Sequence, residues 1–201
     1  MKTDTRRNIH LYYTYISSTP YDAMIVLDRE GKLYYASLGQ NITNLQNLLV
    51  EDFSRQKHVH LKPLSTLPDK TMTSITADKF EQLLLNPKIP QDIPIEMIFG
   101  TRLQRKIWQE LMDIPVGEVR TYGQIADNLN LSKKHARVVG AGCGANRIAI
   151  VIPCHRAIGT DKKLTGYRYG KDAKAYLLEH ELEKKFSRMV LDGGKNAVTT
   201  T

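Results

Sequence analysis

The sequence predicts an α+β protein with a strand-rich N-terminal half and a mostly helical C-terminal half. Three observations support this prediction. Residues 9–38 hold short apolar runs, two later segments carry apolar residues at helical spacing, and residues 121–142 predict two short helices joined by a tight turn. At 201 residues the chain can form one large domain or two small ones.

The N-terminal half predicts three strands followed by two helices. Leu11–Ile16 and Ala23–Asp28 are apolar or aromatic, and a turn at residues 29–32 leads to Leu33–Leu38 in a hairpin pattern. Thr43–Gln56 and Thr76–Asn86 carry apolar residues at helical spacing. This half contains no constellation of reactive side chains, so we interpret it as a scaffold.

Three prolines among polar residues between 86 and 94 predict a linker. We place the domain boundary near residue 92. The expected organisation is an N-terminal domain at 1–92, a C-terminal domain at 93–186 and a disordered tail at 187–201, which ends in glycines and threonines.

The C-terminal half predicts a helix-turn-helix. An amphipathic helix follows Thr101 and stops at residues 114–117. Thr121–Gln124 opens a short helix, and Ser132 caps another that runs to about Gly142. The second of these helices combines small residues with cations. Small residues allow either close helix packing or close approach to DNA, and cations can neutralise phosphates.

The net charge, the length of the apolar runs and the cysteine content limit the kinds of protein that this chain can be. The formal net charge of +8 and the pI near 9.4 suggest a polyanionic partner without establishing one. No apolar run has the ~20 residues of a membrane span, and the N-terminus lacks the apolar core of a secretory signal. The two cysteines, Cys143 and Cys154, suggest a reducing compartment and argue against a disulfide framework or a structural metal site. We expect no metal and no cofactor.

Cys154 is the candidate nucleophile. It follows the β-branched run Ile148–Ile152, which predicts a buried strand, and Pro153 stiffens the backbone in front of it. His155 and Arg156 come directly after it, and a positive environment raises the thiolate fraction of a cysteine. Taken alone, a cysteine in an apolar segment is more often an inert buried residue.

The last predicted helix supplies a partner for His155. Ala173, Leu177 and Glu181 follow one another at i, i+4 and i+8, on one face of this helix. Glu181 either ends the apolar stripe in solvent or pairs with a histidine. A carboxylate beside His155 would orient the imidazole and keep it basic enough to accept a proton.

The chain contains the motif Pro153–Cys154–His155–Arg156, with Asn146 before it and Leu164–Thr165–Gly166–Tyr167 after it. Through these residues the chain resembles, from about Phe99 to Glu181, the O6-alkylguanine-DNA alkyltransferases. The resemblance implies a ribonuclease H-like N-terminal domain and a winged helix-turn-helix-like C-terminal domain. It also implies irreversible transfer of an alkyl group from guanine O6, with O4-alkylthymine as a further candidate, to Cys154. One protein would repair one base. The zinc of some members is not implied, because no cysteine precedes Cys143.

The resemblance also assigns roles to individual residues. Cys154, a water, His155 and Glu181 would form a proton relay, Tyr122 would donate a proton to the leaving guanine, and Asn146 would support the site. Arg137 would fill the space left by the flipped base. The remaining expected DNA contacts are Tyr122, Ala136, Lys133, Lys134, Arg156 and Gly140, and the expected pocket residues are Tyr167, Arg168, Tyr169 and Val151.

Two other functions remain open from the sequence. A cysteine hydrolase or acyltransferase also needs a cysteine, a histidine and a carboxylate, but it would leave the helix-turn-helix and the positive charge unexplained. A protein that recognises lesions without repairing them would not need Cys154. The expected partner is double-stranded DNA containing O6-alkylguanine, bound by a monomer without any membrane. The expected location is intracellular, in the nucleus if the organism is eukaryotic and otherwise in the cytoplasm.

Overall fold

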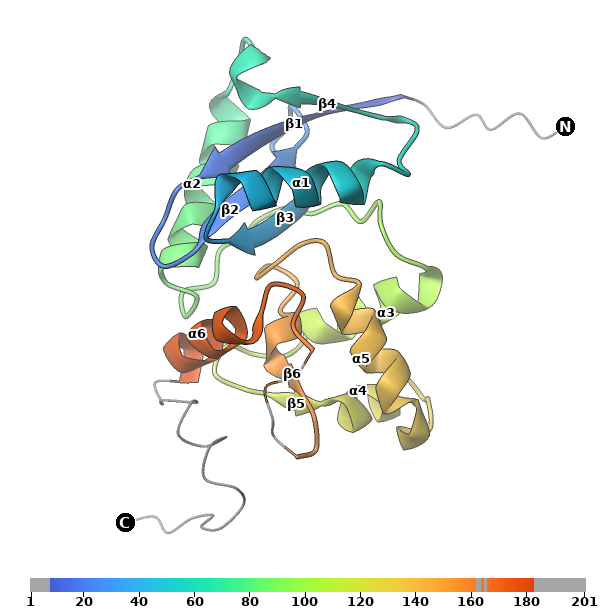
Figure 1. Ribbon diagram of the computed structural model, residues 1–201. Coiled ribbons are helices and arrows are strands. Elements are labelled where there is room, and N and C mark those ends of the chain that lie inside the picture. Colours follow the sequence, from blue (N-terminus) through green and yellow to red (C-terminus); the bar gives the residue numbers. More distant parts are fainter. Residues whose placement is uncertain (1–7, 162–163, 165, 183–201) are drawn as a thin grey trace, which may run out of the picture. The chain divides into compact units, whose positions relative to one another are not determined.

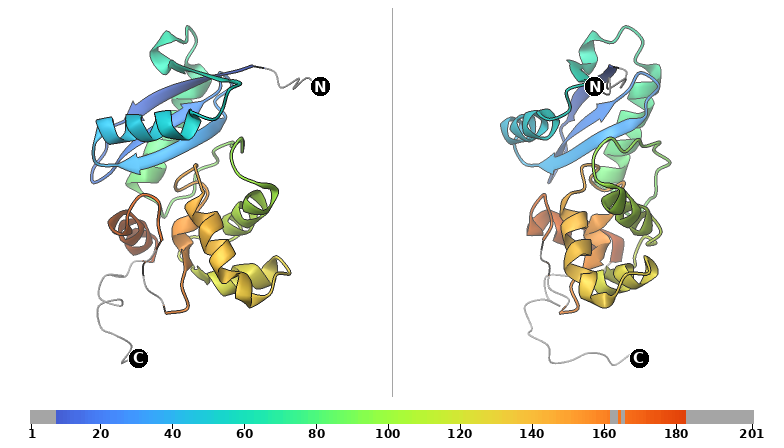
Figure 2. Two further views of the ribbon diagram at one scale, coloured as in Figure 1. Left: turned by 45° about the vertical axis from the view of Figure 1, so that its right-hand side comes forward. Right: turned by 90° about the vertical axis from the view of Figure 1, so that its right-hand side faces the viewer.

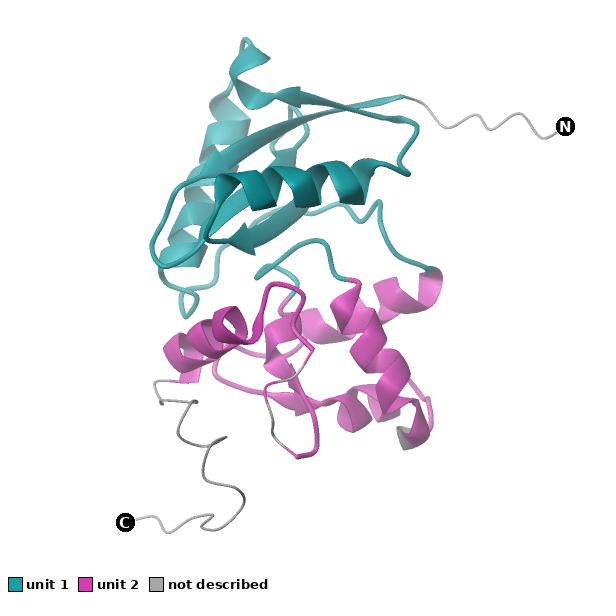
Figure 3. Ribbon diagram, in the orientation of Figure 1, with its two compact units in different colours: residues 1–101, 146–152 teal, residues 102–145, 153–201 magenta. Residues whose placement is uncertain are grey.

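The computed structural model describes residues 8–161, 164 and 166–182, and it is an α+β structure (Figure 1). The chain divides into two compact units, residues 1–101 with 146–152 and residues 102–145 with 153–201 (Figure 3). The first division lies between Thr101 and Arg102 rather than near residue 92. The residues around Pro94 stay with the first unit because the amide of Leu33 donates to the Pro94 carbonyl and the amide of Glu96 to the Leu33 carbonyl.

The first unit is built on a four-stranded sheet with the order β3-β2-β1-β4. Neighbouring strands are antiparallel from β1 to β3, and β4 is parallel to β1. The three predicted strands and their hairpin are therefore confirmed. The strands are β1 (Ile9–Ile16), β2 (Asp22–Leu27), β3 (Leu33–Gly39) and β4 (Val59–Pro63).

Two helices, α1 (Ile42–Phe53) and α2 (Thr71–Leu85), cover opposite faces of this sheet (Figure 2). The Asn41 side chain caps α1 by accepting the amides of Thr43 and Asn44. The apolar face of α1 packs with the strands in one core cluster. Both helices were predicted, although α2 begins at Thr71, before the expected Thr76. A 3₁₀ turn, η1 (Leu64–Thr66), precedes α2.

Residues 148–152 do not form the predicted strand. Ile148 makes a single bridge to Ala36, and the chain then turns, with the Val151 amide donating to the Ala149 carbonyl. Ile150 has a φ of 66°, a conformation that β-branched residues rarely adopt. The prediction failed because a buried apolar run has the same composition in a strand and in a buried turn.

The second unit is mostly helical. Its elements are α3 (Arg102–Met112), β5 (Arg120–Thr121), α4 (Tyr122–Asn128), η2 (Lys133–His135), α5 (Ala136–Gly144), η3 (Cys154–Arg156), β6 (Ala157–Ile158) and α6 (Lys171–Leu182). All four α-helices were predicted, and the turn before α5 is a 3₁₀ turn rather than the first turn of the α-helix.

Among the described residues, no helix is long and apolar enough to cross a membrane. The predicted tail at 187–201 lies outside the described residues.

Candidate active site

Cys154 begins the short 3₁₀ turn η3. Pro153 stands at the N-cap, and the Arg156 amide donates to its carbonyl at 2.9 Å, which closes the turn. The Cys154 side chain is buried, with 3% of the residue exposed. The cysteine is therefore fixed in one backbone conformation and shielded from bulk water.

His155 and Glu181 form the pair predicted from the helical stripe. Nε2 of His155 lies 2.8 Å from Oε1 of Glu181, and both side chains are fully buried. An ionised carboxylate only accepts hydrogen bonds, so Nε2 carries the hydrogen and Nδ1 is the basic nitrogen. Within the described part of the chain, Nδ1 has no hydrogen-bond partner. The imidazole is thus oriented with one nitrogen ready to accept a proton.

Arg156 completes this cluster and corrects one prediction. Its Nε and Nη2 each donate to the Glu181 carboxylate at 2.9 Å, and its Nη1 donates to the Ile114 carbonyl at 2.6 Å. The residue is buried, so its guanidinium is not available to a DNA phosphate. The expectation that the Arg156 side chain contacts DNA is wrong, because the charge is used to hold Glu181.

The charges of the cluster follow from these contacts. Burial alone would raise the pKa of Glu181, but the hydrogen bonds and charges of His155 and Arg156 outweigh it and hold that pKa below its ordinary value. Burial lowers the pKa of His155, against the opposing effect of Glu181. At neutral pH the cluster therefore contains an anionic Glu181, a cationic Arg156 and a neutral His155.

Tyr122 is positioned by the start of α4. The Thr121 hydroxyl accepts the Gln124 amide while the Gln124 side chain accepts the Thr121 amide, which makes a capping box that fixes the first turn. Burial, with smaller contributions from Cys143 and Cys154, raises the pKa of Tyr122 to about 12. The phenol therefore keeps its proton at neutral pH and can donate it in a hydrogen bond.

A surface pocket of about 250 Å³ brings four predicted residues together: Tyr122, Ala136, Arg137 and Gly140. Gly123, Gly159 and Thr160, which the sequence did not single out, complete its lining. Arg137 and Lys134 are exposed. The side chain of Lys133 lies outside the described part of the structure. The start of α5 thus presents small residues and exposed cations around a hollow.

The small residues of α5 differ in how closely they are packed. A Cβ on Gly142 would lie 2.6 Å from Cδ1 of Ile107, so any side chain there would force Ile107 to shift where α5 packs on α3. A Cβ on Gly140 would meet the Tyr122 ring at an ordinary 3.8 Å, so packing does not exclude a side chain there. Gly142 is a packing residue, and Gly140 belongs to the open pocket.

The loop after residue 163 contributes aromatic side chains near the relay. Tyr167 is buried and lies edge-on to His155, with the ring centroids 6.4 Å apart, and edge-on to Tyr169 at 5.4 Å. Arg168 and Tyr169 are half-buried. Thr165 lies outside the described residues.

Asn146 and Val151 belong to the first unit. Oδ1 of Asn146 accepts the Ile148 amide, and Nδ2 donates to the carbonyls of Ile148 and Ile152. Val151 is half-buried in the turn that these bonds close. The predicted turn-forming role of Asn146 agrees with these contacts.

The chain matches curated relatives over most of its length. It is 46% identical over 194 residues to a methylated-DNA–protein-cysteine methyltransferase of Lodderomyces elongisporus, a match that covers 90% of this chain and 96% of that one. The chain belongs to the methylated-DNA–protein-cysteine methyltransferase family. The Candida albicans relative is 47% identical over 173 residues, with 86% and 97% of the two chains covered. Residues 102–183 match the family model for the DNA-binding domain of 6-O-methylguanine DNA methyltransferase.

Solved structures agree with this family assignment. The crystal structure of the Mycobacterium tuberculosis O6-methylguanine methyltransferase has a TM-score of 0.65 and 29% identity, with 86% of this chain and 93% of that chain covered. The Mycobacterium tuberculosis protein in complex with DNA matches with a TM-score of 0.65 and 28% identity, over 87% and 94% of the two chains.

One buried residue of this methyltransferase-family chain was missed from the sequence. Lys174 on α6 is 1% exposed, and its Nζ donates to the Ala157 carbonyl at 2.6 Å. It lies four residues before the buried Leu178 and seven before Glu181, a spacing that places all three on one helical face. That spacing could have identified it, but a lysine at a helix start is usually exposed.

Proposed function

We propose that this protein repairs O6-alkylguanine in double-stranded DNA by transferring the alkyl group to Sγ of Cys154. The observation that carries the proposal is the buried His155–Glu181 pair, which adjoins the cysteine in the chain and leaves Nδ1 of the imidazole able to accept a proton. Membership of the methyltransferase family supports the same reaction.

The reaction begins with the Cys154 thiol. Its proton moves, through a water as the relay requires, to Nδ1 of His155, and Glu181 stabilises the resulting imidazolium. The thiolate attacks the alkyl carbon, so that an S–C bond forms while the C–O6 bond breaks. The electron pair of that bond stays on the guanine, and Tyr122 donates a hydrogen bond or proton to the ring as negative charge develops. The product is a thioether, which offers water no electrophilic carbonyl, so each protein acts once.

DNA would be bound by the helix-turn-helix of the second unit. Lys133 and Lys134 would neutralise phosphates, and the small residues Ala136 and Gly140 would let α5 approach the duplex closely. Arg137 would occupy the space vacated when the lesion is flipped out of the stack, a movement that costs a few kcal/mol and less for a poorly paired base. The pocket beside Tyr122 supports this assignment.

The finer features of the proposal follow the same family assignment. The sheet with a parallel fourth strand supports a ribonuclease H-like first domain, and β5 with β6 beside the helices supports a winged helix-turn-helix in the second. We further propose that the loop at 167–169 lines the base pocket, that the protein acts as a monomer, and that it works where the DNA is, in a nucleus or a prokaryotic cytoplasm.

Intact mass after incubation with a duplex that carries one O6-methylguanine tests the proposal. We expect a gain of one methyl group per protein on Cys154, with no further gain at excess DNA, and no gain for Cys154→Ala. Lesion binding without a mass change would indicate a recognition protein. Neither binding nor a mass change, together with turnover of an ester or amide substrate, would favour a cysteine hydrolase.

Tyr169 is expected to limit the size of the alkyl group. Its ring is half-buried and lies edge-on to the ring of Tyr167, another expected pocket residue. Opening such a pocket is typically worth a factor of ten or more, so we expect Tyr169→Gly to react about tenfold faster with O6-benzylguanine. The rate with an O6-methylguanine duplex is the control and should change little. Equal inactivation rates for the wild type and Tyr169→Gly would reject this role.

A further inference from the structure

The segment that leads to Cys154 is bound to the first unit. Residues 146–152 belong to that unit, whereas Cys154 belongs to the second (Figure 3). The Ala36 amide donates to the Arg147 carbonyl at 2.9 Å, and the Ala149 amide donates to the Ala36 carbonyl at 3.0 Å. Ala36 lies on β3, an outer strand of the sheet. The segment 146–152 is therefore attached to the edge of the sheet by two backbone hydrogen bonds.

A buried ion pair adds a side-chain contact to these backbone bonds. Nε of Arg147 donates to Oδ1 of Asp52 on α1 at 2.7 Å, at the short end of the range for charge-assisted hydrogen bonds. The side chain of Asp52 is 4% exposed and that of Arg147 is 21% exposed. By contrast, the Lys32–Glu96 pair is 3.5 Å long, with side chains 42% and 49% exposed. Exposed pairs of that kind contribute little, whereas a shielded pair is screened much less by salt.

The Asp52 carboxylate is itself held in place by the sheet. Its Oδ2 accepts the hydroxyl of Tyr35 at 3.1 Å, and Tyr35 is fully buried on β3. Phe53, the next residue on α1, lies edge-on to the Tyr35 ring with the centroids 5.5 Å apart. One oxygen of the carboxylate thus contacts β3 and the other contacts Arg147. A side chain whose own position is fixed in this way is able to fix the position of its partner.

The segment 146–152 depends on its surroundings for its conformation. Ile150 has a φ of 66°, which persists only when neighbouring groups enforce it. The side chain of Asn146 closes the turn internally, while the contacts of Arg147 attach the turn to β3 and α1. Pro153 directly follows the segment and caps the turn that begins at Cys154. A displacement of the segment would therefore be passed along the chain to the cysteine sulfur.

We propose that Asp52 is a positioning residue whose ion pair with Arg147 fixes the segment 146–152 and thereby the place of the Cys154 sulfur. The inference rests on the proposed alkyl transfer and deepens it, because it gives the first unit a role in the reaction beyond that of a scaffold. Displacement at the alkyl carbon requires the sulfur, the carbon and O6 to be aligned, so a small displacement of the sulfur slows the step. Asp52 acts through Arg147 and not on the reacting atoms.

The test uses variants of the full chain that change the pair in different ways. Asp52→Asn removes the negative charge and keeps an oxygen for Tyr35. Arg147→Met removes the guanidinium and keeps an unbranched apolar side chain, and Arg147→Lys keeps the positive charge. The double variant Asp52→Asn/Arg147→Met removes both charges of the pair together, which avoids leaving one of them without the other. Glu51→Gln makes the same change of charge at an exposed position of α1 and is the matched control.

The first readout is the rate of methyl transfer from a duplex with one O6-methylguanine. Intact mass follows a single turnover at several duplex concentrations, at a temperature where circular dichroism shows every variant to be folded, so that a loss of stability alone leaves the rate unchanged. We expect the maximal rate to fall about tenfold in Asp52→Asn and Arg147→Met, less than the hundredfold that a displacement of about 1 Å is able to cost. The duplex concentration at half-maximal rate should change little, because the proposed DNA contacts lie in the second unit.

The remaining variants show whether the effect belongs to the pair. If Asp52 and Arg147 act through their mutual contact, the double variant should be no slower than either single variant, whereas independent effects would multiply. Arg147→Lys should recover part of the rate, and Glu51→Gln should match the wild type. Multiplied effects in the double variant would overturn the proposal.

The second readout is hydrogen exchange, which does not depend on the reaction. The amides of Val151 and Ile152 are bonded within the turn, to the carbonyls of Ala149 and Ile148. In Asp52→Asn, a peptide that covers residues 147–154 should exchange faster. Exchange in the inner strand β2 should not increase by the same factor, because β2 reports on unfolding of the whole unit. A merely structural role of the pair would raise exchange in both places alike.

The two readouts together separate this inference from the proposed function. Wild-type transfer by folded Asp52→Asn, or slower transfer without faster exchange in the segment 146–152, would overturn the role of Asp52 and leave the alkyl transfer intact. If the wild type takes up no methyl group, the proposed function fails, and unchanged exchange in Asp52→Asn would then reject the attachment of the segment as well. If Asp52→Asn does not fold, the double variant carries the test.

Discussion

Glu181→Gln is expected to destabilise the protein by about 3–5 kcal/mol, because it leaves the buried guanidinium of Arg156 without a counter-charge. The carboxylate accepts three hydrogen bonds, one from His155 and two from Arg156, and no part of its side chain is exposed. Glutamine keeps the size of the side chain but offers one oxygen in place of two and no charge. Denaturant unfolding followed by circular dichroism would measure the loss.

The same substitution is expected to lower the rate of alkyl transfer about a hundredfold, within the range found for lost acid–base catalysis. His155 would lose the group that orients it and stabilises its protonated form. Single-turnover mass analysis with an O6-methylguanine duplex, at a temperature where the variant is folded, measures this rate separately from stability.

The pH dependence of stability provides a second readout. The pKa of Glu181 is lower in the folded protein than its ordinary value of 4.5, so the stabilisation is complete above that value and is lost as the pH falls below it. The lowered pKa of His155 acts in the same direction, because the unfolded chain takes up a proton below pH 6.5 more readily than the folded one. Below pH 4.5, the wild type should lose the stability that ionised Glu181 contributes. Glu181→Gln has no such contribution to lose, so this part of its pH dependence should be absent.

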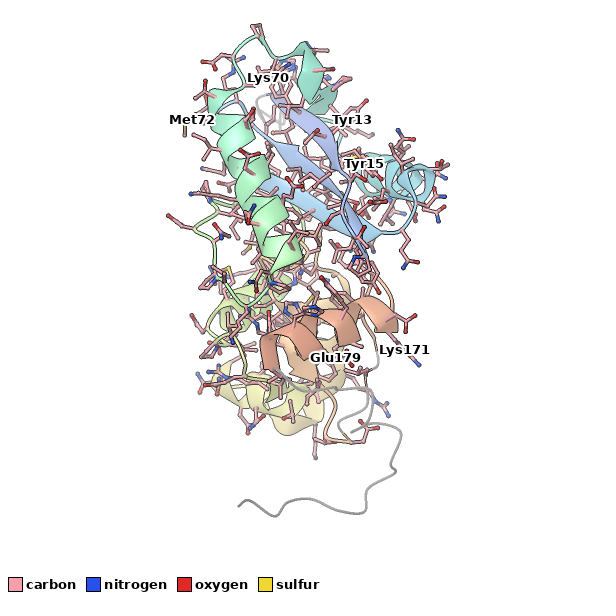
Figure 4. The ribbon with its side chains drawn as sticks, turned by 90° about the vertical axis from the view of Figure 1, so that its left-hand side faces the viewer. Tyr13, Tyr15, Lys70, Met72, Lys171 and Glu179 are labelled. Atoms are coloured by element: carbon pink, nitrogen blue, oxygen red, sulfur yellow. The ribbon has the colours of Figure 1, made fainter. Side chains whose placement is uncertain are left out.

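Glu179→Gln is the matched control, since it makes the same change of charge on the outer face of α6 (Figure 4). We expect its stability to lie within about 0.5 kcal/mol of the wild type. If Glu179→Gln and Glu181→Gln were equally stable, Arg156 would not depend on Glu181 for its charge balance, and our account of the buried cluster would fail.

The sequence predicted those parts of the site that follow from regular spacing. Glu181 continues an apolar stripe at i+8, so its burial could be foreseen, and a buried carboxylate requires a partner. The capping residue Thr121 fixes the start of α4 and therefore the place of Tyr122. In both cases the controlling interactions lie within one helix, and local interactions can be read from sequence.

The parts that were missed depend on long-range contacts. Arg156 was expected among the DNA contacts from the family resemblance, and only the fold brings its guanidinium to Glu181 and to the carbonyl of Ile114. Lys174 was overlooked because its burial depends on β6, which is far away in sequence. The turn at 148–152 was taken for a strand because its apolar composition gives no sign of the positive φ at Ile150.

Asn146→Ala is expected to cost about 2–4 kcal/mol of stability. The buried amide of Asn146 satisfies the Ile148 amide and the carbonyls of Ile148 and Ile152, and alanine would leave all three polar groups without this partner. These bonds also hold a turn that contains Ile150 in a conformation that costs about 1–3 kcal/mol and persists only when the surroundings fix it. Denaturant unfolding measures the effect.

Asn146→Asp separates the acceptor role of this side chain from its donor role. Aspartate keeps an oxygen for the Ile148 amide but replaces the donor to the two carbonyls with a second acceptor, so it should be at least as destabilising as alanine. Asn44→Ala, on the exposed face of α1, is the control and should change stability by less than about 0.5 kcal/mol.

Because residue 152 leads through Pro153 into the turn of Cys154, folded Asn146→Ala should also react more slowly with an O6-methylguanine duplex. If Asn146→Ala had the stability and the reaction rate of the wild type, burial of apolar side chains alone would hold the turn. The hydrogen bonds of the Asn146 side chain would then add nothing to its stability.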